Sequence, residues 1–139
     1  MWGYILKILS VERKYNKKVP IPQVIEELSK YLKEGGWQVQ EVAGVERGIL
    51  QARKGGILQE LIASDRALTL TFELQPDGLL VKVGVANWQR NIAIAAIETL
   101  LISGLFLLVD VPEILWNKHI EEEVLKVLDQ IIEKAPPAN

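Results

Sequence analysis

The sequence predicts a two-layer α+β domain, with a mainly antiparallel four-stranded sheet and helices packed on one of its faces. Three observations support this. An amphipathic helical segment comes first, four segments with strand character follow it, and the C-terminal third returns to helical spacing. Strands grouped together and flanked by helices, rather than alternating strictly with them, are typical of α+β folds.

Residues 22–34 form the first predicted helix. Pro22 is compatible with a first helical turn, and the two glycines Gly35 and Gly36 supply a stop. The apolar side chains in between recur at helical spacing and form one stripe. They are Val24, Ile25, Leu28, Tyr31 and Leu32.

The four strands are expected at residues 37–42, 48–54, 67–74 and 79–85. The last two alternate apolar and polar residues and flank Gln75-Pro-Asp-Gly78, so they predict a hairpin in which Gly78 takes a positive φ. One face of the sheet is therefore apolar and the other polar. We expect the polar face to be solvated, the alternative being a surface that pairs with a second copy. It carries Gln38, Gln40, Gln51, Arg53, Thr69, Thr71, Glu73 and Lys82.

We expect one domain over residues 21–134, with an N-terminal extension (1–20) and a short tail (135–139). The extension is compatible with an extra strand, a short amphipathic helix or a segment docked on the core. Residues 55–63 suit a short helix or a wide connection. The last helix ends at Lys134. Its apolar stripe consists of Trp116, Ile120, Val124, Leu128 and Ile131.

The composition narrows the functional classes. The net charge is −2 and the pI is about 5.5, so the whole chain lacks the basic field expected of a nucleic-acid binder. We interpret the local basic stretch Arg13, Lys14, Lys17 and Lys18 as a solvated connector. The absence of cysteine removes disulfides and thiolate chemistry, and it suits a cytoplasmic address.

Several short strings resemble a domain of unknown function found in uncharacterised bacterial proteins. They are Gln51-Ala-Arg-Lys-Gly-Gly56, Ala67-Leu-Thr-Leu-Thr71 and Pro76-Asp-Gly78 through Val83-Gly-Val-Ala-Asn-Trp88. That domain has an amphipathic helix, a QARKGG strand, an ALTV strand, a VxVGxxxW strand and an apolar helix. The similarity covers about residues 21–134. It implies the same order of elements and names no activity, and the zinc ribbon of some relatives does not transfer to a chain without cysteine.

The sequence offers little material for catalysis. His119 is the only histidine, and no nucleophile elbow, metal-ligand spacing or phosphate-binding glycine loop is present. We interpret Gly35-Gly36 and Gly55-Gly56 as a helix stop and a strand exit. We therefore expect no catalytic residue, no metal and no cofactor, and we favour a protein that is not an enzyme.

Residues 92–109 form an apolar run with a single charge, Glu98. Three interpretations are open. The run is a buried core helix in which Glu98 pairs with Arg66, Arg90 or Lys118; or a subunit interface; or a membrane-contacting segment. Glu98, Gly104 and Asp110 argue against membrane spanning. The interface would use Ile94, Leu101, Leu105, Phe106 and Trp116.

From these observations we favour a non-catalytic binding or assembly module that forms a homodimer through residues 92–116. The alternative is a small-ligand-binding or enzymatic domain with a pocket formed by Glu98, Arg66, Arg90 and Trp88. A peripheral membrane adaptor is the third possibility. The apolar surplus of the chain motivates the first choice.

Overall fold

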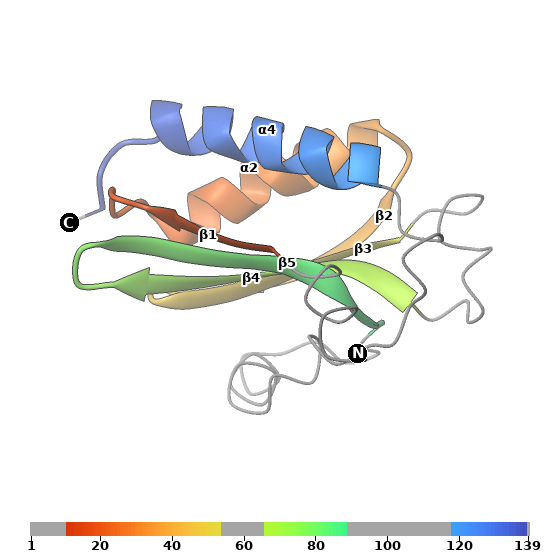
Figure 1. Cartoon of the computed structure of the whole chain (residues 1–139), viewed down its shortest axis with the longest axis horizontal. Coiled ribbons are helices and arrows are strands. Elements are labelled where there is room, and N and C mark those ends of the chain that lie inside the picture. The colour runs from red at the N-terminus through yellow and green to blue at the C-terminus, as the bar shows by residue number, and fades with distance from the viewer. Residues whose placement is uncertain (1–10, 54–65, 89–117, 139) are drawn as a thin grey trace, which may run out of the picture.

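A computed structural model describes residues 11–53, 66–88 and 118–138 of the chain. These residues form an α+β domain in which two helices lie on the same face of one antiparallel sheet of five strands (Figure 1). The strand order is β1-β5-β4-β3-β2. In chain order the elements are β1 (Val11–Tyr15), α2 (Ile21–Glu34), β2 (Gln38–Ala43), β3 (Arg47–Arg53), β4 (Arg66–Gln75), β5 (Gly78–Asn87) and α4 (Lys118–Lys134).

The predicted class and the placement of helices on one face are confirmed, but the sheet has a fifth strand. β1 lies within the segment interpreted as an N-terminal extension, and it pairs antiparallel with β5 from Val11↔Val83 to Tyr15↔Leu79. The interpretation of the basic stretch as a solvated connector is therefore wrong for its first part. Three of the five residues of β1 are charged, and it becomes a strand because β5 offers it a free edge.

The four predicted strands all form, with bounds that differ by one or two residues from those expected. β4 and β5 make the predicted hairpin, paired from Arg66↔Asn87 to Gln75↔Gly78 around Pro76 and Asp77. The reason given for Gly78 is wrong, however. Among the described residues the glycine with a positive φ is Gly36. Gly78 is required because a Cβ there would overlap the carbonyl oxygen of Tyr15, where β1 lies against β5.

α2 begins after Pro20 and ends in a Schellman motif. The amide of Trp37 donates to the carbonyl of Leu32 over 3.0 Å, and the amide of Gly36 donates to that of Lys33 over 3.0 Å. Gly36 has a φ of 90°, which glycine adopts without steric cost. The chain thus reverses directly from α2 into β2, as the glycine pair predicts.

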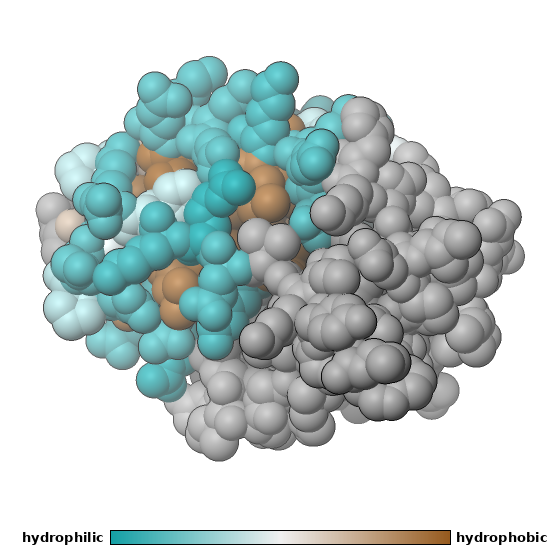
Figure 2. Space-filling view, viewed as in Figure 1, coloured by the Kyte–Doolittle hydropathy of each residue, from teal (hydrophilic) through white to brown (hydrophobic). Residues whose placement is uncertain are grey.

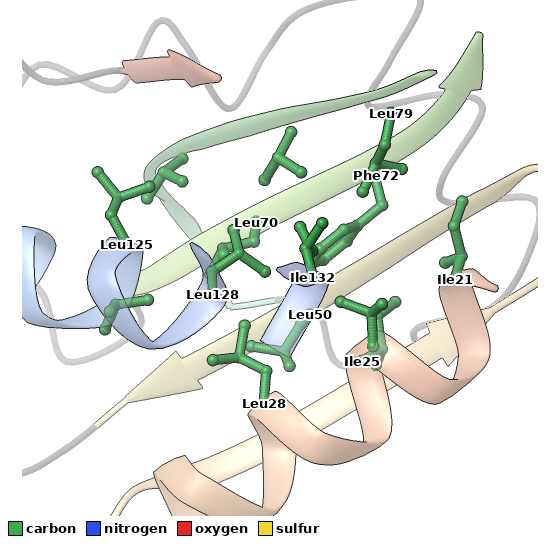
Figure 3. Packing of buried hydrophobic residues seen from close by; sticks show 14 of the residues in the cluster. Ile21, Ile25, Leu28, Leu50, Leu70, Phe72, Leu79, Leu125, Leu128 and Ile132 are labelled. Atoms are coloured by element: carbon green, nitrogen blue, oxygen red, sulfur yellow. The ribbon is translucent and has the colours of Figure 1, made fainter. Parts of the chain in front are cut away.

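The core lies between the helices and the apolar face of the sheet (Figure 3). Phe72, Leu50 and Leu70 from the sheet meet Ile25 and Leu28 of α2, and all five are buried. α4 buries Val124, Leu125, Leu128 and Ile132, while the predicted stripe residues Ile120 and Ile131 are only half-buried. The buried cluster draws on β3, β4, β5, α2 and α4, and partly buried side chains of β1 and β2 pack against it, so the core joins these elements into one unit.

β1 is also tied to α4 by polar contacts. Arg13 donates to both carboxylate oxygens of Asp129 at 2.9 and 2.7 Å, and the Tyr15 hydroxyl donates to Asp129 Oδ1 at 2.6 Å. Lys17 Nζ donates to the carbonyls of Ile132 and Glu133 at 3.1 and 3.2 Å, where a helix C-terminus favours a cation. The edge strand and the last helix therefore hold each other in place.

Candidate functional site

The polar face of the sheet, opposite the two helices, carries a row of hydrogen-bonded side chains across three strands. Gln40 Nε2 on β2 donates to Gln51 Oε1 on β3 at 2.9 Å, and Gln51 Nε2 donates to Thr69 Oγ1 on β4 at 3.0 Å. Thr69 in turn donates to the carbonyl of Ala67 at 3.2 Å. The register places Gln40, Gln51, Thr69 and Gly84 directly opposite one another, so the row follows from the pleat.

The middle of this face is not the solvated surface that the alternation predicts. Gln51, Thr69 and Thr71 are buried, and so is Ile49 beside them. α2 and α4 cannot account for this burial, because both lie on the other face (Figure 1). A buried amide without partners would cost about 1–3 kcal/mol, which explains why the Gln51 amide both accepts and donates a hydrogen bond within the row.

At one end of the face, Arg53 and Trp88 meet across the sheet. β3 and β5 both run antiparallel to β4, so their C-terminal ends lie at the same end of the sheet. Arg53 ends β3 and Trp88 follows β5, and the guanidinium carbon of Arg53 lies 4.1 Å from the centroid of the Trp88 ring. Between them β4 and β5 present only the small buried residues Ala67 and Ala86, which leaves room for the two long side chains to approach.

Arg53 is held from a second side. Its Nε donates to Gln38 Oε1 at 2.9 Å, and Gln38 is the cross-strand partner of Arg53 on β2. An arginine stacked on an aromatic ring and bonded through Nε still has two terminal nitrogens with which to donate. Within the described part of the chain, no carboxylate forms an ion pair with Arg53.

The predicted ligand-binding residues are placed only in part. Trp88 lies at this corner, half-buried, and the cation that stacks on it is Arg53. Arg66 begins β4, and its backbone pairs with that of Asn87 near the same end of the sheet. Its side chain is not among those that the structure describes. Arg90 and Glu98 lie outside the described residues, so the predicted pocket around Glu98 stays a prediction. The same holds for the interface residues Ile94, Leu101, Leu105, Phe106 and Trp116.

Sequence reasoning missed Arg53 and Gln38 as site residues, although a signal was present. Both belong to the polar face by strand alternation, and both stand at strand ends next to a glycine-rich or aromatic position. The strand directions place Arg53 and Trp88 at the same end of the sheet once β4 is known to lie between β3 and β5. The alternation was recognised, but the strand order was needed to use it.

The second polar cluster is Arg13, Tyr15 and Asp129. Burial raises the pKa of the Tyr15 phenol above its usual range, and the hydrogen bond to Asp129 raises it further. Asp129 also raises the pKa of Arg13, chiefly by accepting its hydrogen bonds. The Asp129 carboxylate is engaged by both neighbours, and the cluster joins β1 to α4.

The outer surface of the helix pair holds an open groove of about 480 Å³. Its lining mixes charges of both signs with three apolar side chains, among them Tyr31, which is 39 % exposed. The described surface in this view is mostly hydrophilic, with small apolar areas between the polar side chains (Figure 2). Such mixed lining favours no particular class of ligand.

In the ranges 11–53, 66–88 and 118–138, no group of histidine, cysteine and carboxylate side chains is arranged to hold a metal ion. No helix within these same ranges is long and apolar enough to cross a membrane.

Comparison of the chain with protein-family models, with curated proteins and with solved structures finds no match.

Proposed function

We propose that the protein is a non-catalytic binding and assembly module that self-associates as a homodimer through residues 92–116. The observation that carries this proposal is the closed core on the helix face of the sheet. α2 and α4 cover that face, and the core cluster there consists of buried residues from β3, β4, β5, α2, α4 and their flanks, with partly buried side chains of β1 and β2 packed against it. The apolar run 92–109 lies outside the described residues, and the proposal assigns it to an interface between two copies.

An apolar run of this length must be hidden from water. Its eighteen residues contain one charged side chain, and large exposed apolar surfaces in soluble proteins mark sites of association. A twin segment from a second copy would hide it, because obligate interfaces resemble a divided core. The titratable cluster of the described residues, Arg13, Tyr15 and Asp129, serves to hold β1 to α4, which agrees with a protein whose polar groups are structural.

Sedimentation velocity of the full chain tests the proposal. We expect a species of twice the 15.6 kDa chain mass that persists into the low micromolar range. The double variant Leu101→Lys/Leu105→Lys places two charges in the proposed interface and is expected to shift the protein to monomer, since an unpaired charge buried in an interface costs several kcal/mol.

Val45→Lys is the matched control, because Val45 is an apolar residue that is 79 % exposed at the turn between β2 and β3. This variant should sediment like the unmodified protein. A monomer at high micromolar concentration of the unmodified chain would reject the proposal. Circular dichroism of Leu101→Lys/Leu105→Lys shows whether the variant retains the fold, and a folded variant that remains dimeric would also reject it.

A further inference from the structure

We propose that Arg53 is the recognition group of a small-molecule oxyanion site, which takes a carboxylate or phosphate group on the two terminal nitrogens of its guanidinium. The site lies at the end of the sheet where β3 and β5 finish. This site does not depend on self-association of the protein, so each proposal can be tested and rejected without affecting the other.

The first support is that the guanidinium is held in one orientation. The guanidinium carbon lies over the Trp88 ring, 4.1 Å from its centroid, and Gln38 accepts from Nε at 2.9 Å. These contacts come from β5 and β2, on either side of the β3–β4 pair, so three strands of the sheet determine where the terminal nitrogens lie. An arginine whose rotamers are already restricted loses less entropy when it binds a ligand.

The second support is that the charge of Arg53 is not compensated in the described part of the chain. On this face of the sheet Glu12 lies opposite Lys82 and Glu73 lies opposite Arg47, so these charges are matched across strands. Lys14 is ion-paired with Asp77 at 3.1 Å. Arg53 instead has the neutral Gln38 as its cross-strand partner, and the adjoining row of Gln40, Gln51 and Thr69 is neutral too.

The third support is the chemistry of the donors that remain. With Nε engaged, the two terminal nitrogens present parallel N–H groups that match two oxygens of a carboxylate or phosphate. Arg53 is half-buried, so a ligand can reach it while the field is less screened than at a fully exposed position. The net charge of −2 disfavours a polyanion such as nucleic acid and favours a small anion.

The test is an NMR titration of the full ¹⁵N-labelled chain with inorganic phosphate and, separately, with acetate, at constant ionic strength maintained with chloride. The Nε–H signal of Arg53 and the indole N–H signal of Trp88 report directly on the site. We expect saturable shifts of both signals. Saturation by phosphate alone assigns the site to phosphate groups, by acetate alone to carboxylates, and by both to oxyanions in general.

The matched variants are Arg53→Gln and Arg47→Gln. Arg47 lies on the same strand and the same face, at the other end of β3. We expect Arg53→Gln to weaken binding at least about tenfold, as the loss of a charge-assisted bidentate contact implies, while Arg47→Gln leaves affinity unchanged. Linear shifts without saturation, or equal weakening in both variants, would overturn the proposal.

A third variant covers the case in which Arg53→Gln does not fold. Arg53→Lys keeps the charge and the aliphatic stem but loses the planar pair of donors. A several-fold weakening in Arg53→Lys with retained fold supports the site. Unchanged affinity in this variant would show that a general positive charge, and not the fixed guanidinium, attracts the anion, which contradicts the proposal.

Discussion

Gly48 lies on β3 where α2 crosses the sheet, and substituting it tests how closely the two layers pack. A Cβ at this position would lie 2.5 Å from Ile25 Cδ1 and 2.8 Å from Ile21 Cγ2. Both isoleucines are buried, so the helix cannot yield without disturbing the core. We therefore expect Gly48→Ala to destabilise the protein, although alanine in place of glycine stiffens the unfolded chain.

The size of the effect follows from the overlapping atoms. Overpacking of a filled core destabilises a protein by about 1–3 kcal/mol. The reduced entropy of the unfolded chain in Gly→Ala offsets about 0.4–1 kcal/mol of this loss. Ile25→Val removes Cδ1, the nearer of the two atoms, and by itself costs about 0.5–1.5 kcal/mol. In the double variant only the approach to Ile21 Cγ2 remains. We expect the double variant to be about 1 kcal/mol more stable than the sum of the single effects.

Urea unfolding followed by circular dichroism measures the free energy of unfolding of the four proteins in this cycle. Gly44→Ala is the control, because among the described residues a Cβ there would have only the Arg47 carbonyl oxygen as a neighbour within 4 Å, at 3.4 Å. It should change the free energy of unfolding by less than about 0.5 kcal/mol. The reasoning fails if the two effects in the cycle add to within about 0.3–0.5 kcal/mol, since additivity means that the two residues do not compete for space.

Two more predictions concern the attachment of β1. Gly78→Ala places a Cβ on the carbonyl oxygen of Tyr15, so β1 must separate from β5 at this end. We expect the free energy of unfolding, measured with urea, to fall by about 3 kcal/mol and the β1 amides to exchange faster. Retained exchange protection in β1 would contradict this. The pKa of Tyr15 is raised in the folded state, so the unfolded chain loses this proton first, near pH 10, and the free energy of unfolding falls as the pH rises further. Tyr15→Phe should flatten that decline between about pH 9 and pH 11, and an unaltered slope would show that the hydrogen bond to Asp129 does not hold the proton.

Local patterns were sufficient to predict most of the fold. Helix α2 follows from the spacing of Val24, Leu28 and Leu32 with a glycine stop, and the β4–β5 hairpin follows from strict alternation around a turn sequence. These signals are reliable because each depends on neighbours in the chain, where the period of side-chain direction is set by the backbone itself. The stripe of α4 was predicted with the same logic: Val124 and Leu128 are buried as expected, Ile120 and Ile131 are only half-buried, and the buried Leu125 and Ile132 were not predicted.

The fifth strand could not be predicted in this way. β1 has the sequence Val-Glu-Arg-Lys-Tyr, and Arg13 and Tyr15 occupy positions on its core face where a predicted strand would carry aliphatic residues. Arg13 is tolerated there because Asp129 on α4 lies opposite, and that carboxylate is distant in sequence. The identity of such a strand depends on the edge it pairs with and not on its own hydrophobic pattern.

The candidate site, too, could be predicted from the sequence only in part. From the sequence alone we could infer a polar sheet face that contains Arg53 and a Trp88 at the end of a strand. Arg53 and Trp88 meet only because β4 lies between β3 and β5 and the residues between them, Ala67 and Ala86, are small. The burial of Gln51 and Thr69 is likewise not predicted by alternation, which leaves this face open to water. The sequence determines which faces exist because side-chain direction is a local property. Only the tertiary structure determines what each face meets, because strand order and packing arise from contacts between residues far apart in the chain.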